Sequence, residues 1–180
     1  MKKIGVFGGT FDPFTKAHIE IVNKALDIVD EVVIIPTTIT YYRESNIPPL
    51  FSFEQRVSII QECCKEWEDV YVSGIEYGRP DTWRFVDTLE KFKEIWAKDG
   101  EEIYIIVGSD TFDKLETWAS YEHIIANYKF IVAEGRDGKH SVNALPHETI
   151  EVQNNQCSAS ATRKKLVEIL KNEYLDWLEL

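Results

Sequence analysis

The chain has 180 residues and a formal net charge of −11, with 44% hydrophobic and 28% charged residues. This composition is typical of a globular protein, and we expect a single domain that spans residues 1–180. The excess of acidic groups argues against nonspecific binding to nucleic acid or to an anionic membrane. It does not exclude a small anionic ligand, because local amides and a few cations can override the overall charge.

Two further features bound the class of protein. The longest apolar runs, EVVIIP and IYIIVG, are too short to span a bilayer, and the first residues lack the apolar stretch of a signal peptide. The three cysteines show no CxxC spacing and indicate no disulfide framework. We therefore expect a cytoplasmic protein that binds neither membrane nor nucleic acid. The sequence leaves open whether the chain forms a homo-oligomer.

The first elements form a strand–helix–strand unit. Residues 2–9 predict a buried strand that ends at two glycines, and the apolar spacing of residues 18–29 predicts an amphipathic helix. Residues 31–37 are continuously apolar and β-branched, which is typical of a strand buried on both faces. Such a unit predicts two parallel strands joined by a crossover helix.

The rest of the chain continues this alternation after a loop of some 15 residues at 37–51. We expect helices at 52–67, 84–98 and 161–180, short helical stretches at 111–118 and 121–128, and strands at 70–77, 101–110, 129–138 and 147–153. Alternating strands and helices predict an α/β fold with a doubly wound sheet of mainly parallel strands. In such sheets the ligand site lies at the carboxyl ends of the strands.

The segment GGTFDPFTKAH follows the first strand. Gly8 and Gly9 let backbone amides approach a ligand, and the following helix directs its positive dipole end to the same place. Thr15 and His18 are three residues apart, so they share one helix face. This pattern fits a phosphate site with His18 as a donor. It equally fits a tight turn in which His18 is a partly buried hydrogen-bonding residue.

A second cluster, QCSASATRKKL, lies near the end of the chain. Ser158 and Ser160 precede a predicted helix, where serine is a favoured N-cap. Arg163 and Lys164 fall in its first turn, where cations oppose the helix dipole. An anion bound at this helix start would explain them. The alternative is a solvated basic face.

These segments resemble a known superfamily. GGTFDPFTKAH is similar to the (H/T)xGH signature region of the nucleotidyltransferases, and SASATR is similar to their ISSTxIR region. Four further segments follow in the order found in bacterial nicotinate-nucleotide adenylyltransferases: VDTL, VGSD, LETW and GRDG. The resemblance implies a Rossmann-like fold and an ATP-dependent transfer to nicotinate mononucleotide. The products would be deamido-NAD and pyrophosphate, in NAD biosynthesis.

The resemblance also implies roles for particular residues. It assigns catalysis to His18, Thr15 and Arg163, and it implies that Mg²⁺ enters with ATP, without a metal site on the protein. The implied ATP-binding positions are Gly8, Gly9, Thr10, Phe11, Thr15, His18, Gly108, Asp110, Arg136, Ser158, Ser160 and Arg163. Trp118 matches the tryptophan that stacks on the pyridine ring of the acceptor, although a packing role fits it equally.

The acceptor side departs from the pattern of this branch. Leu50 and Phe51 stand where the branch has His and Lys, and Arg84 and Phe85 replace a Tyr/Thr pair that contacts nicotinate. Arg43 and Arg84 are therefore candidates for binding a phosphate or carboxylate of the acceptor. Each also fits an exposed surface residue.

Two other functions stay open at this point. PLFSFEQRV resembles a segment of the pantetheine-phosphate adenylyltransferases of coenzyme A biosynthesis, which makes that activity the runner-up. A nucleotide-binding member of the family without transferase activity is the third candidate. GSDTFDKLETW favours the nicotinate branch, and the presence of His18, Asp110 and Arg163 favours catalysis.

Overall fold

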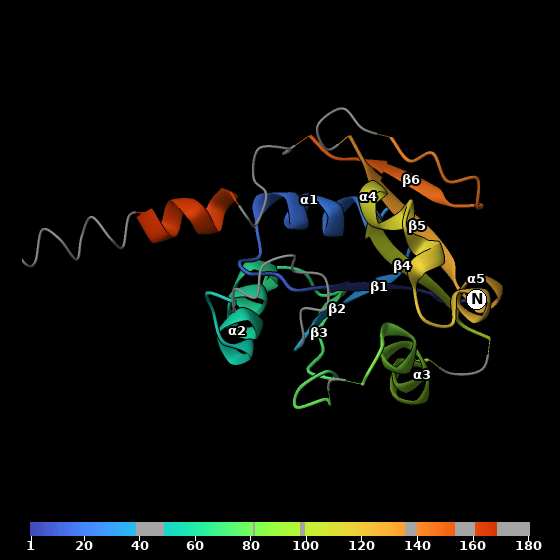
Figure 1. Ribbon diagram of the computed structural model, residues 1–180, viewed down its shortest axis with the longest axis horizontal. Helices are drawn as coiled ribbons and strands as arrows, with labels where there is room; N and C mark the ends of the chain where they lie inside the picture. The colour runs from blue at the N-terminus through green and yellow to red at the C-terminus, as the bar shows by residue number, and fades with distance from the viewer. Residues whose placement is uncertain (39–48, 81, 98–99, 136–139, 154–160, 169–180) are drawn as a thin grey trace, which may run out of the picture.

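A six-stranded parallel sheet forms the centre of the molecule (Figure 1). The computed structural model describes residues 1–38, 49–80, 82–97, 100–135, 140–153 and 161–168. The strands are β1 (Lys3–Gly9), β2 (Glu31–Pro36), β3 (Val70–Val72), β4 (Glu102–Gly108), β5 (Lys129–Glu134) and β6 (Glu148–Glu151), and their order in the sheet is β3-β2-β1-β4-β5-β6. The predicted α/β fold class is confirmed.

Helices cover both faces of this sheet. They are α1 (Lys16–Ala25), α2 (Phe53–Cys64), α3 (Phe85–Trp96), α4 (Ser109–Phe112), the 3-10 turn η1 (Leu115–Thr117) and α5 (Tyr121–Asn127), and residues 161–168 are also helical. Figure 1 shows α1 and α3 on opposite sides of the sheet. None of the described helices is long and apolar enough to cross a membrane.

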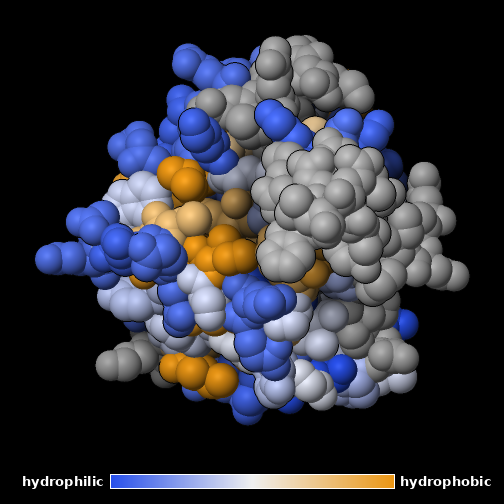
Figure 2. Space-filling view, turned by 90° about the vertical axis from the view of Figure 1, so that its left-hand side faces the viewer, coloured by the Kyte–Doolittle hydropathy of each residue, from blue (hydrophilic) through white to orange (hydrophobic). Residues whose placement is uncertain are grey.

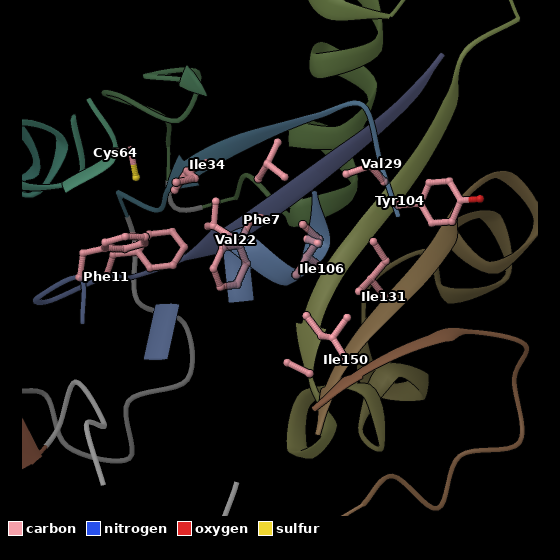
Figure 3. Packing of buried hydrophobic residues seen from close by; sticks show 14 of the residues in the cluster. Phe7, Phe11, Val22, Val29, Ile34, Cys64, Tyr104, Ile106, Ile131 and Ile150 are labelled. Atoms are coloured by element: carbon pink, nitrogen blue, oxygen red, sulfur yellow. The ribbon is translucent and has the colours of Figure 1, made fainter. Parts of the chain in front are cut away.

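The core consists of two clusters, one on each face of the sheet. One packs Val22 of α1 and Ile60 of α2 against alternate residues of the strands, and Figure 3 shows it running from Phe11 to Ile150. The other packs residues of α3 and α5 against the opposite face. Because β2 and β4 contribute side chains to both clusters, they read as continuous apolar runs in the sequence.

The strand order reverses between β1 and β4, which are neighbours although a large part of the chain separates them. Their carboxyl ends lie side by side, since Phe7 pairs with Ile106. In a doubly wound sheet this switch point is the usual ligand site. Figure 2 looks onto the side of the molecule towards which β1 runs, where hydrophobic side chains gather among hydrophilic ones.

Some element boundaries differ from the prediction. The strand predicted at 70–77 ends at Val72, because β3 is an edge strand and the chain then turns, with the Tyr77 N–H donating to the Gly74 carbonyl at 2.9 Å. The helix predicted at 18–29 spans Lys16–Ala25. The strand predicted at 101–110 ends at Gly108, where α4 begins.

Candidate functional site

The turn between β1 and α1 is held by packing of aromatic rings. Phe11 has a φ of 49°, a left-handed conformation that is uncommon for a residue other than glycine. Its ring is 3% exposed and packs edge to face on both Phe7 and Phe14, with centroids 5.1 and 5.4 Å apart. The resemblance to the nucleotidyltransferases implies that Phe11 is an ATP contact. With its ring buried, any such contact would come from its backbone.

His18 is fixed by this turn. Its ring stacks on Phe14 and meets Phe11 edge to face, at 5.2 Å in both cases. The N–H of Thr15, the N-cap of α1, donates to His18 Nδ1 at 2.9 Å. A backbone N–H can only donate, so Nδ1 acts as the acceptor and the proton of the neutral ring lies on Nε2. The turn therefore sets both the orientation and the tautomer of His18.

Thr15 is buried, and its hydroxyl lies 3.0 Å from the same His18 nitrogen. The sequence predicts that the two residues share a helix face, and the structure places them in direct contact. The contact belongs to the reciprocal capping pattern of a helix N-terminus, with histidine in the place usually taken by Glu or Gln. In this arrangement Thr15 orients His18.

The glycines at the ends of β1 and β4 differ in what surrounds them. A Cβ on Gly8 would lie 2.8 Å from the ring of Phe85, and a Cβ on Gly9 would lie 2.9 Å from the ring of Phe11. Packing against these rings therefore disfavours a side chain at either position, a reason that the sequence does not reveal. A Cβ on Gly108 would meet no described residue within 4 Å, and its φ of −79° suits any residue. The open space at Gly108 can admit a ligand.

Arg163, from the helical segment 161–168, reaches the turn after β1. Its Nη1 donates to Asp12 Oδ2 at 2.9 Å and to the Asp12 carbonyl at 3.2 Å. Asp12 is 1% exposed, and its carboxylate also accepts the N–H groups of Leu50 and Phe51 at 2.9 and 3.0 Å. The predicted catalytic residues Arg163, Thr15 and His18 are therefore brought to one turn.

Arg56 of α2 is a second buried charge at the same edge. It is 2% exposed, and its Nη1 donates to the carbonyls of Thr10 and Thr37 at 2.6 and 2.9 Å, while its Nε donates to that of Phe51 at 3.3 Å. It thereby ties the end of β1 to both ends of the loop predicted at 37–51. Neither Asp12 nor Arg56 is a predicted site residue. One signal was present, since Arg56 lies at helical spacing with Ile60 on the buried face of α2.

The acceptor candidates form an aromatic pair next to the glycine turn. Phe85, the first residue of α3, lies beside Gly8 and meets Trp118 edge to face, with centroids 5.1 Å apart. Trp118 directly follows η1 and is partly buried. Arg84 is the exposed N-cap of α3, and its N–H donates to Asp87 Oδ2 at 2.7 Å. The structure therefore unites Gly8, Phe85 and Trp118 and leaves Arg84 at the rim.

The remaining predicted residues divide into two groups. Asp110 lies two residues after Gly108, in the first turn of α4. It is exposed, and its carboxylate can bind hydroxyl groups of a ligand. Arg43, Arg136, Ser158 and Ser160 lie outside the described residues.

Among the described residues, one group has the side chains and spacing to hold a metal ion: Glu134, His140 and Glu151 at the ends of β5 and β6. His140 Nδ1 lies 2.7 Å from Glu134 Oε2, which is the geometry of an ion pair. The pKa of His140 is raised by this hydrogen bond and by the charges of the two glutamates. None of the three is a predicted site residue.

Known proteins resemble this chain in sequence and in fold. A model of the cytidylyltransferase-like family matches residues 6–165. A probable nicotinate-nucleotide adenylyltransferase of Fusobacterium nucleatum is 34% identical over 175 residues, which cover 96% of this chain and 81% of the relative. One of Geobacter sulfurreducens is 33% identical over 150 residues, covering 80% of this chain and 67% of the relative.

A solved structure supports the same fold. The nicotinic acid mononucleotide adenylyltransferase of Plasmodium falciparum, complexed with NaAD, superposes with a TM-score of 0.75 at 21% identity, covering 91% of this chain and 83% of that chain. A putative nicotinate-nucleotide adenylyltransferase of Vibrio parahaemolyticus superposes with a TM-score of 0.58 at 23% identity, covering 73% of each chain.

Proposed function

We propose that this chain, which belongs to the cytidylyltransferase-like family and is a nucleotidyltransferase, joins ATP and nicotinate mononucleotide to give deamido-NAD and pyrophosphate. The relatives at 34% and 33% identity carry the name of this activity. The observation that supports it best within the chain is the His18 geometry. Because Nδ1 of His18 accepts the Thr15 N–H, the neutral ring presents an N–H donor at Nε2, beside the switch point where a triphosphate would lie.

In the proposed reaction, a phosphate oxygen of the acceptor attacks the α-phosphorus of ATP. The new P–O bond forms as the bond to the β-phosphate breaks, and pyrophosphate leaves with the bonding electron pair. Such transfers depend on positioning and charge stabilisation and need no covalent intermediate. His18 would donate from Nε2 to the phosphate oxygens as negative charge builds, and Thr15 would keep it in place.

The two ends of the substrate pair are bound by different groups in this proposal. The triphosphate would lie between His18 and Arg163, with the nucleoside over Gly108 and the ribose hydroxyls near Asp110. The pyridine ring of the acceptor would lie against Trp118 and Phe85. Arg84, the exposed N-cap of α3, would bind the carboxylate of nicotinate or the acceptor phosphate.

Mg²⁺ would enter as part of the substrate Mg–ATP, held by phosphate oxygens and water, as is usual for this ion. In the turn after β1, the carboxylate of Asp12 is bound to Arg163 and to two backbone N–H groups. Asp110 is the exposed carboxylate at the neighbouring strand end. The proposal also includes a cytoplasmic location and allows a homo-oligomer.

A pyrophosphate-release assay with Mg–ATP and a panel of acceptors tests the proposal. Turnover with nicotinate mononucleotide at a kcat/KM well above that for nicotinamide mononucleotide is the expected result. Turnover with phosphopantetheine alone would instead establish the coenzyme A activity. Tight ATP binding without turnover on any acceptor would indicate a nucleotide-binding protein that has lost transfer.

A further inference from the structure

We propose that Asp12 is a positioning residue that holds, with one carboxylate, both the phosphate-binding Arg163 and the end of the loop predicted at 37–51, which we call the acceptor loop. This inference rests on the proposed function, because it takes Arg163 as a ligand of the ATP phosphates. Asp12 itself is not proposed to touch either substrate. It acts through the groups that it holds.

The charge of Asp12 is deeply buried. Asp12 is 1% exposed, and a carboxylate removed from water to that degree is costly unless cations and donors surround it. Arg163 supplies the cation, and the N–H groups of Leu50 and Phe51 supply two further donors. These two amides belong to residues 38 and 39 positions further along the chain, so the carboxylate links the turn after β1 to distant segments.

Asp12 binds one nitrogen of the Arg163 guanidinium. Within the described residues, the contacts of its guanidinium are both made by Nη1, to the side chain and to the carbonyl of Asp12. Guanidinium is a planar fork with five N–H donors. A fork fixed at one nitrogen keeps Nε and Nη2 in a defined plane, so that they can donate to a phosphate without further loss of side-chain freedom.

The same carboxylate binds the end of the acceptor loop. Leu50 and Phe51 are the last residues of the predicted loop 37–51, directly before the Ser52 N-cap of α2. Phe51 is held a second time, since its carbonyl accepts from Arg56 Nε at 3.3 Å. Asp12 thus sets the position of the loop end relative to Arg163, and the donor and acceptor sides share one fixed point.

A double-mutant cycle tests this inference. The variants are Asp12→Asn, Arg163→Ala and the double substitution, and the readouts are the KM for ATP, the KM for the acceptor and kcat. Asp12→Asn alone is expected to lower kcat/KM for ATP by roughly 10- to 100-fold, the range for losing a charged hydrogen bond. In the Arg163→Ala background the same change is expected to add about twofold or less.

The outcomes separate the two proposals. A wild-type chain that does not turn over ATP with nicotinate mononucleotide would reject the proposed function. The positioning role would be rejected if the wild type is active but Asp12→Asn lowers kcat/KM for ATP by the same factor with Arg163 absent as with Arg163 present. A purely structural residue acts independently of its partner. Glu62→Gln is the matched control, because it removes a carboxylate from the exposed Lys65–Glu62 ion pair.

A second variant decides the matter if Asp12→Asn does not fold. Arg163→Lys keeps a cation that can reach ATP but loses the planar fork that binds the carboxylate and a phosphate at once. We expect the kcat/KM of Arg163→Lys for ATP to fall close to that of Arg163→Ala. A value close to that of the wild type would overturn it.

Discussion

The donor half and the acceptor half of the candidate site are built differently. In the turn after β1, which we call the donor turn, the side chains of Phe11, Asp12 and Thr15 are buried. Phe11 packs on neighbouring rings, Asp12 binds Arg163 and Thr15 contacts His18. In the acceptor half, Arg84 is exposed and Trp118 is partly exposed. A triphosphate has the same shape in every reaction of this kind, so a rigid turn suits it. An acceptor is distinguished by its side groups, and exposed side chains can change to fit them.

The largest expected effect tests the rigid half. His18→Ala removes a donor that the turn has already oriented, and kcat is expected to fall by ~10²-fold or more. The free energy of unfolding serves as the control, because His18 also packs on Phe14 and caps α1. Steady-state kinetics on a folded variant check the prediction. An unchanged kcat would show that His18 is only a helix cap.

A pair of glycine substitutions sharpens the comparison further. Gly8→Ala places a methyl group 2.8 Å from the Phe85 ring and is expected to lower the free energy of unfolding by about 1–3 kcal/mol. Gly108→Ala meets no described neighbour, so stability is expected to stay the same or rise by up to about 1 kcal/mol. The same change should raise the KM for ATP by about tenfold, because the methyl group occupies the space assigned to the nucleoside.

Chemical denaturation and ATP kinetics on both glycine variants check this contrast. If Gly108→Ala left the KM for ATP unchanged, the nucleoside would lie elsewhere. If Gly8→Ala left stability unchanged, the packing of Phe85 on the turn would be looser than the contact distance indicates.

Trp118→Ala tests the acceptor half. The expected result is a rise of roughly tenfold in the KM for nicotinate mononucleotide, since stacking of an aromatic ring contributes about 1–3 kcal/mol. The affinity for ATP should change little. Isothermal titration with each substrate separates the two effects, and an equal loss for both would indicate that Trp118 serves only to pack Phe85.

The smallest effect concerns an ion pair outside both halves, that of His140 with Glu134. The pKa of His140 is raised by its hydrogen bond to Glu134. The contribution of charged His140 to stability is therefore complete below about pH 6.5, the pKa of free histidine. Burial acts most strongly on Glu134 and raises its pKa, but the hydrogen bonds from His140 and from the Ser141 N–H, with the charges of His140 and His147, together outweigh it and the pKa is lowered. The pair is therefore complete between about pH 4.5 and 6.5 and weakens as pH rises through the raised pKa of His140.

Thermal unfolding from pH 5 to pH 9 measures this dependence. The Tm of His140→Ala is expected to lie slightly below that of the wild type at pH 5–6 and to converge with it towards pH 9. A difference that stays constant with pH would show that His140 acts by packing and not by charge.

Local patterns in the sequence were enough to predict the alternation of strands and helices, the turn after the first strand and the proximity of Thr15 to His18. These features depend on residues close together in the chain, where period and spacing set the geometry. The bond between Asp12 and Arg163 and the contact of Phe85 with Gly8 join distant segments. No local pattern encodes such contacts, because they depend on how the sheet brings strand ends together.

The short β3 illustrates the same limit within a single element. The residues from Val70 to Tyr77 alternate as a strand would, but only Val70–Val72 find a partner in β2. Pairing ends two residues before the end of β2, because the chain turns after Val72, and this depends on the path of the chain and not on the composition of the segment.

The reverse reaction tests the central claim most directly. The chain is supplied with deamido-NAD, Mg²⁺ and pyrophosphate, and ATP formation is followed by luminescence. The account predicts ATP from deamido-NAD in amounts matched by nicotinate mononucleotide, because pyrophosphate attacks the same phosphorus that the forward reaction transfers. Formation of ATP from dephospho-coenzyme A but not from deamido-NAD would contradict it.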